Sequence, residues 1–145
     1  MLVYFDTCAI QRPLDDPAQL RVRLEAEAMV ALIELCESGR LELVASAAHE
    51  IENRQNPHPD RLTHASDVLA IARRYVPTTA EVADRAAAYE RAGIKRLDAL
   101  HLASAAISGA DFFCTTDDLL LRRGRKAETG ATSVVSPLDL IQDLP

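Results

Sequence analysis

Near the start of the chain, Leu2-Val3-Tyr4-Phe5-Asp6-Thr7 forms a run of four apolar residues that ends abruptly in an acid and a hydroxyl. A short apolar run bounded by polar residues predicts a buried β-strand. We expect four more short strands, at residues 41–44, 75–76, 112–114 and 133–135. The end of the first strand matters most, because it fixes the position of Asp6.

Helical patterns lie between these strands. Residues 11–17 contain two prolines and two acids and indicate a loop. Strands that alternate with helices predict an α/β fold with a mainly parallel central sheet flanked by helices. The length of 145 residues suits a single domain, 1–145. Helices are expected at residues 18–38, from Ser46 to a break at 56–59, at 60–74, from Thr78 or Thr79 to 92, at 97–108, after Asp117 and after Pro137.

The bulk composition restricts the function. The formal net charge is −6, which argues against a protein that coats nucleic acid passively but leaves a nuclease open. No apolar run approaches the roughly 20 residues that span a bilayer, and no signal peptide is evident, so we expect a cytoplasmic protein without a membrane segment. Three cysteines without paired spacing predict neither a disulfide framework nor a zinc site.

Four acidic residues stand at the ends of predicted elements. Asp6 follows the first strand and Asp117 closely follows the strand at 112–114, so both are expected at the edge where parallel sheets bind ligands. Glu50 lies on the first turns of the helix after Ser46, where it is preferred over Glu52 because of its distance from the cap. Asp98 precedes a nearly all-apolar helix. Each acid alone also has a structural explanation, as a helix cap, a loop acid or a solvated helix residue.

Taken together, the four acids predict a centre for hard cations. Mg²⁺ and Mn²⁺ prefer carboxylate oxygens and keep several waters. Ions held in this way activate water and neutralise the charge that develops on a phosphodiester. The pattern therefore favours a Mg²⁺- or Mn²⁺-dependent centre that cleaves phosphodiesters, with Asp6, Glu50, Asp98 and Asp117 as metal ligands and catalytic residues.

Five segments, taken in order, cover nearly the whole chain and resemble a known family. They are Val3-Tyr4-Phe5-Asp6-Thr7, Ser46-Ala47-Ala48-His49-Glu50-Ile51, Asp98-Ala99-Leu100-His101-Leu102-Ala103, Phe113-Cys114-Thr115-Thr116-Asp117 and Val134-Val135-Ser136-Pro137-Leu138-Asp139-Leu140-Ile141. The sequence resembles the PIN-domain ribonucleases, which include the toxins of VapBC-type toxin–antitoxin pairs.

The resemblance implies a function and partners. It implies endonucleolytic cleavage of RNA, one or two Mg²⁺ or Mn²⁺ ions on the four acids, an antitoxin protein as a partner, and a homodimer. Thr7 and Thr115 match polar positions beside the first and last acids, and Asp118 is a further supporting candidate or a simple helix cap.

Basic residues near these acids are candidates for RNA contacts. Arg122 and Arg123 belong to a short basic run that either contacts the phosphate backbone or is a solvated surface. Arg12 belongs to an Arg-Pro-x-Asp-Asp loop that resembles a subgroup of PIN-like proteins. It either contacts a phosphate or pairs with Asp15 or Asp16, and the structural pairing is favoured. His101, in an apolar helix, is expected to be a core or rim histidine.

Two other classes of function compete with the nuclease. One is a catalytically inactive PIN-like binding module that acts through a protein partner. The other is a phospho-acceptor α/β domain with Asp6 as the nucleophile. A phosphatase of the haloacid-dehalogenase kind has a second aspartate two residues later, where this sequence has Cys8, so this class is disfavoured.

Overall fold

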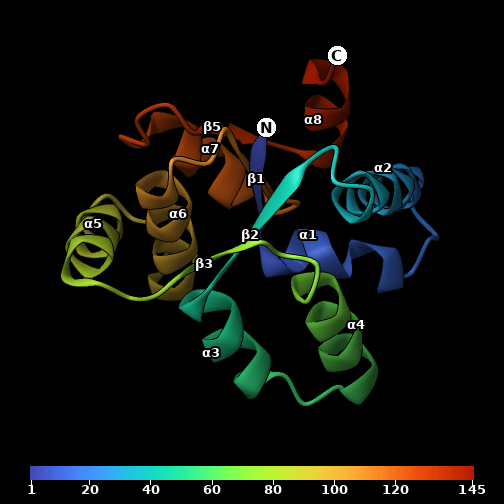
Figure 1. Ribbon diagram of the computed structural model, residues 1–145, viewed down its shortest axis with the longest axis horizontal. Coiled ribbons are helices and arrows are strands. Elements are labelled where there is room, and N and C mark those ends of the chain that lie inside the picture. Colours follow the sequence, from blue (N-terminus) through green and yellow to red (C-terminus); the bar gives the residue numbers. More distant parts are fainter.

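A parallel sheet forms the centre of the molecule. The computed structural model describes all residues, 1–145, and places the sheet between two groups of helices (Figure 1). The strand order is β3-β2-β1-β4-β5, and all four neighbouring pairs are parallel. The α/β fold and the single parallel sheet are thus confirmed, with β1 at the centre. The strands are β1 (Leu2–Phe5), β2 (Glu42–Ser46), β3 (Arg74–Val76), β4 (Phe112–Cys114) and β5 (Ser133–Val135).

The central strand divides the core into two halves. Leu2 and Tyr4 of β1 pack with α5 (Ala80–Arg91), α6 (Arg96–Ser108) and α7 (Asp118–Lys126), whereas Val3 and Phe5 pack on the opposite face. This division follows from the alternation of side chains along a strand. The helices of the second face are α1 (Thr7–Gln11), α2 (Leu20–Glu37), α4 (Pro59–Leu69) and α8 (Pro137–Asp143). The remaining helix, α3 (Ala47–Gln55), directly follows β2 and contacts α6.

Two segments differ from the sequence-based expectation. The predicted loop at 11–17 is partly helical, because α1 ends at Gln11 and a 3₁₀ turn, η1, spans Arg12–Leu14. Helices of one turn carry no period that a sequence pattern can reveal. The helix expected at 60–74 ends at Leu69, because the chain must extend to pair β3 with β2; the Arg73 amide already donates to the carbonyl of Leu43.

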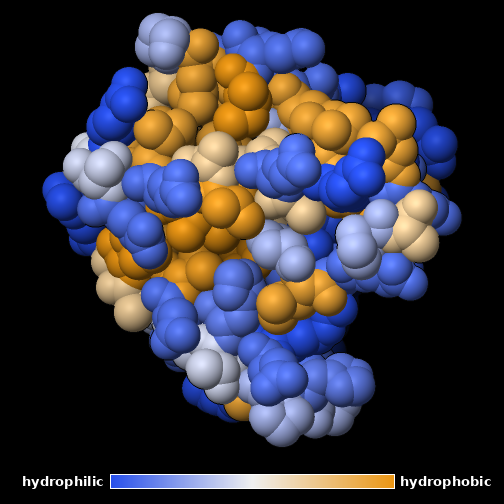
Figure 2. Space-filling view, turned by 90° about the vertical axis from the view of Figure 1, so that its right-hand side faces the viewer, coloured by the Kyte–Doolittle hydropathy of each residue, from blue (hydrophilic) through white to orange (hydrophobic).

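The surface on the α2 side is mostly polar with separate apolar patches. Figure 2 shows this side, which lies at the right of Figure 1, with apolar atoms among charged ones. The largest exposed apolar side chains of α2 and α8 are Leu20, Leu24, Val30, Leu138 and Ile141. None of the helices is long and apolar enough to cross a membrane.

A buried ion-pair network fixes the turn after α1. Arg12 donates to Asp15 at 2.9 Å and approaches Glu25 of α2 at 3.1 Å, while Arg61 of α4 also binds Asp15. The side chain of Glu25 is only 2% exposed, and Arg21 is its second cationic neighbour, at 3.5 Å. Arg12 is therefore in a structural pairing, the alternative that the sequence favoured, and it anchors η1 to two helices.

The network predicts a large loss of stability in Arg12→Ala. Removing Arg12 leaves the buried Glu25 with only the more distant Arg21, and breaking a buried pair in this way costs about 2–4 kcal/mol. The free energy of unfolding in urea measures this loss. Arg23→Ala is the matched control, because Arg23 lies on the exposed face of α2 and makes no ion pair. Equal stability of the two variants would contradict the role of Arg12.

Candidate metal centre

Asp6 is a buried carboxylate at the end of the central strand. Its residue is 3% exposed, and its amide donates to the carbonyl of Cys114 on β4, which holds the two strand ends together. One carboxylate oxygen, Oδ2, accepts hydrogen bonds from Thr115 Oγ1 at 3.0 Å and from Cys8 Sγ at 3.1 Å. Burial raises the pKa of Asp6, although His101 and these hydrogen bonds act in the opposite direction. The negative charge is therefore poorly compensated.

Glu52 and His101 lie beside Asp6. His101 is completely buried, and its Nε2 lies 2.8 Å from Glu52 Oε1 and 4.0 Å from Asp6 Oδ1. Burial opposes charge on both partners, but their hydrogen bond and mutual attraction lower the pKa of Glu52 and raise that of His101. One ligand atom from each of these three residues lies within 4.8 Å of the other two.

Glu50 does not join this group. Its side chain is 50% exposed, and its nearest ionic partner is Arg54, one turn along α3 at 3.6 Å. The reason is the helical period: His49 is buried against the sheet, and a residue three positions later shares that face. Glu52 occupies that position, whereas Glu50 lies about 100° around the helix from His49. The structure therefore places Glu52, and not Glu50, beside Asp6.

Asp98 lies near both Asp6 and Asp117. Asp98 is in the first turn of α6, and burial, followed by the charges of Asp6 and Asp117, raises its pKa to about 6. Asp117 is the N-cap of α7, where its Oδ1 accepts from the amides of Leu119 and Leu120. Asp98 and Asp117 line the same small cavity. The structure thus brings three of the four predicted acids to one edge of the sheet.

The supporting candidates fall into two groups. Thr115 binds both Asp6 and the amide of Asp117, so it links two of the acids. Thr7 Oγ1 is buried beside Glu52 without a hydrogen bond of normal geometry. Asp118, in contrast, is exposed and forms a two-pronged ion pair with Arg21, outside the cluster.

The basic candidates also differ in position. Arg123 lines the cavity of Asp98 and Asp117 and donates to the carbonyl of Gly93, whereas Arg122 is exposed on the surface of α7. Lys95, which no sequence pattern indicated, lines the same cavity at the start of α6. Basic side chains therefore border the acidic edge.

The donor set fits a divalent cation. Neither a lysine nor an arginine pairs with Asp6, Glu52 or Asp98, so their mutual repulsion is relieved only by His101 and by hydrogen bonds. Asp6 Oδ1 makes no hydrogen bond, and Thr7 Oγ1 is a buried polar atom that also lacks one. Carboxylates that converge without a cationic partner are the arrangement that binds hard divalent ions.

Comparison with known proteins identifies the family. The PIN domain family matches residues 3–126. The chain belongs to the PIN domain family. Two solved structures share its fold: FitAB bound to an IR36 DNA fragment, with 17% identity and a TM-score of 0.59, and VapBC2 from Rickettsia felis bound to a DNA fragment from its promoter, with 12% identity and a TM-score of 0.60. The aligned regions cover 93% and 94% of this chain and 94% and 98% of those chains, respectively. No curated protein sequence matches the chain significantly.

The crowded acids of this PIN domain predict that Asp98→Asn stabilises the metal-free protein at neutral pH. The folded pKa of Asp98, about 6, lies above the value of about 4 for an unfolded aspartate, so the wild type loses stability as the pH rises through this range. Asparagine does not titrate. In EDTA we expect the variant to melt about 2–5 °C higher at pH 7.5, with a difference that shrinks towards pH 4.

Thermal melting at several pH values measures this effect. Asp84→Asn, at an exposed position of α5, is the matched control and should show no such pH-dependent difference. A melting temperature of Asp98→Asn equal to that of the wild type across the range would show that Asp98 is not repelled by its neighbours.

Proposed function

We propose that this PIN domain is a metal-dependent endoribonuclease that acts in the cytoplasm as the toxin of a toxin–antitoxin pair. The observation that carries the proposal is the convergence of Asp6, Glu52, Asp98 and Asp117 at the carboxyl edge of the sheet, where no lysine or arginine pairs with them. The proposed metal ligands and catalytic residues are therefore the acids predicted from the sequence, with Glu52 in place of Glu50.

In the proposed centre, the surroundings of each acid determine its role. Asp6, Glu52 and Asp98 would hold a Mg²⁺ or Mn²⁺ ion, which when bound activates water and offsets charge on the scissile phosphate. Thr115 fixes the orientation of Asp6 through a 3.0 Å hydrogen bond. Asp117 uses one oxygen as a helix cap and keeps the other for a water or a metal-bound ligand.

Basic side chains at the rim would hold the RNA backbone. Lys95 and Arg123 border the cavity of Asp98 and Asp117, so a phosphate over the acids would lie within their reach. Arg122 would extend this contact along α7. Arg12 is engaged with Asp15 and Glu25, which gives it a structural role instead of RNA binding.

Variants of the two glutamates test the proposal directly. Glu52→Gln, Asp6→Asn, Asp98→Asn and Asp117→Asn are each expected to lower the rate of RNA cleavage in Mn²⁺ by about 100-fold or more, because each removes a charge that holds the cation. Glu50→Gln is the matched control and should cleave at the wild-type rate, since Glu50 points away from the cluster. The assay follows cleavage of a labelled single-stranded RNA, and a reaction in EDTA gives the metal-free background rate.

Two results would contradict the proposal. Wild-type cleavage by the aspartate variants would remove the acids from catalysis, and a loss in Glu50→Gln without a loss in Glu52→Gln would reverse the choice between the glutamates. A wild-type protein without metal-dependent cleavage would favour the alternative, a catalytically inactive PIN-like module that acts through a protein partner.

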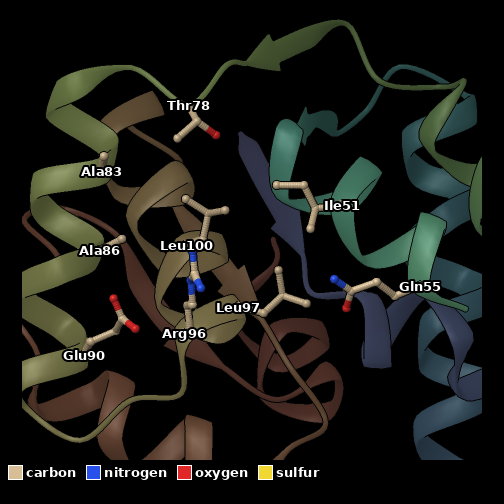
Figure 3. Close-up of a pocket in the computed structure, with 9 residues that line it drawn as sticks. All are labelled: Ile51, Gln55, Thr78, Ala83, Ala86, Glu90, Arg96, Leu97 and Leu100. Carbon is tan, nitrogen blue, oxygen red and sulfur yellow. The ribbon is translucent and has the colours of Figure 1, made fainter.

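An apolar groove beside the metal centre favours a protein partner in either case. The groove, about 690 Å³, lies between α3, α5 and α6, and Figure 3 shows Ile51, Leu97 and Leu100 reaching into it. Ile51 and Leu97 are next in sequence to Glu52 and Asp98, so helices α3 and α6 supply residues to both the groove and the acidic cluster. VapBC pairs consist of a toxin and an antitoxin, and we propose that an antitoxin segment occupies this groove. The polar rim of the groove consists of Gln55, Thr78, Glu90 and Arg96.

A homodimer is the second assembly that we propose.

Ala83→Arg tests the partner site. Ala83 lies on the exposed side of α5 within the groove, so a long side chain there fills the groove without disturbing the core. We expect the affinity for the protein encoded next to this gene to fall at least tenfold, which corresponds to about 1.4 kcal/mol. Calorimetry on the purified proteins measures this affinity. Ala92→Arg, an exposed position outside the groove, is the control. Equal affinities of both variants would place the antitoxin elsewhere.

A further inference from the structure

His101 presents a nitrogen to the acidic cluster. Its Nε2 faces Glu52 Oε1 at 2.8 Å and Asp6 Oδ1 at 4.0 Å, and its side chain is completely buried. His101 is thus the buried histidine that the sequence predicted, and its ring also faces two carboxylates. The three ligand atoms already lie within 4.8 Å of one another, so small side-chain shifts would bring all three onto one ion.

The other nitrogen of His101 is held by a buried chain of hydroxyls. Nδ1 lies 2.6 Å from Tyr4 Oη, which in turn lies 2.6 Å from Ser46 Oγ. The Tyr4 hydroxyl oxygen can accept a hydrogen bond from Nδ1–H, while the Tyr4 hydroxyl donates its own hydrogen bond to Ser46 Oγ. In the metal-free protein Nε2 carries a proton that it donates to Glu52, and a bound metal ion would take the place of that proton. Histidines that bind metals usually donate the second N–H to a fixed acceptor in this way.

The neighbouring histidine cannot take the same role. His49 Nδ1 accepts from the Ser46 amide at 3.1 Å, so its Nε2 carries the proton, which it donates to the carbonyl of Phe5 at 2.7 Å. Both nitrogens are therefore used. Tyr4 stacks on the His49 ring, with the ring centres 4.7 Å apart, and this packing fixes the hydroxyl that binds His101.

An unpartnered hydroxyl supports a ligand at this place. Thr7 is 6% exposed, and its Oγ1 lies beside Glu52 without a hydrogen bond of normal geometry. Buried polar atoms nearly always have a partner. An ion with bound water between Asp6, Glu52 and His101 would supply one.

We propose that His101 Nε2 is a direct ligand of the metal ion, together with Asp6 and Glu52, and that it makes the centre prefer divalent transition metals over Mg²⁺. Imidazole nitrogen suits transition metals, whereas Mg²⁺ takes oxygen ligands almost exclusively. This inference rests on the proposed function, since it concerns the same centre. It adds a nitrogen ligand and a metal selectivity that an all-carboxylate site does not have.

The test measures metal binding, not cleavage. Mn²⁺ is added to the full chain after EDTA treatment, and pulsed electron paramagnetic resonance detects ¹⁴N nuclei bonded to the ion. We expect ¹⁴N coupling in the wild type and its loss in His101→Gln. By calorimetry, the affinity of His101→Gln for Mn²⁺ should fall about tenfold or more, while that for Mg²⁺ changes less than about threefold. The control is His64→Gln, because His64 binds the carbonyl of Ile10, away from the cluster.

The outcomes separate this inference from the proposed function. Mn²⁺ binding by the wild type without ¹⁴N coupling would overturn the role of His101 and leave the carboxylate centre intact. Equal losses of Mn²⁺ and Mg²⁺ affinity in His101→Gln would overturn the selectivity. No Mn²⁺ binding by the wild type at millimolar concentration would overturn both. The wild-type spectrum decides the ligand question even where His101→Gln folds poorly.

Discussion

The arrangement depends on one constraint, the burial of the Asp6 carboxylate at the end of the central strand. The parallel sheet forces this position, because β1 lies between β2 and β4 and its carboxyl end opens where α3, α6 and α7 begin. A buried ionised carboxylate is costly unless a cation or several donors compensate it. Asp6 has one hydroxyl, one thiol and a histidine at 4.0 Å. This local deficit explains the raised pKa values around it.

The same molecule neutralises its other buried acid in a different way. Glu25 is as buried as Asp6, but Arg12 and Arg21 both approach it, and the pair with Arg12 ties η1 to α2. Glu25, an acid that stabilises the fold, is thus neutralised by arginine side chains. The absence of arginine from the pairs of Asp6 and Asp98 marks the edge of the sheet as a place where negative charge is kept. Uncompensated charges of this kind, which lower stability, are expected at functional sites.

The sequence predicted the positions of elements better than the orientations of side chains. The strands and the long helices carried clear hydrophobic periods, and the rule that parallel strands gather ligands at their carboxyl ends led to Asp6 and Asp117. Glu50 was chosen for its distance from the helix cap, although the face of α3 is set by the buried His49. The i, i+3 spacing of His49 and Glu52 was the available signal. The role of His101 had no such signal, because its partners come from β1, β2 and α3.

The central claim is that Asp6, Glu52 and Asp98 share one cation. The most direct measurement is a crystal structure of the chain grown with Mn²⁺, with anomalous diffraction recorded to locate the metal. We expect an anomalous peak bonded to Asp6, Glu52 and Asp98, about 2.0–2.3 Å from its ligand atoms. A crystal at saturating Mn²⁺ with no peak at this edge, or with a peak bound by Glu50, would contradict this claim.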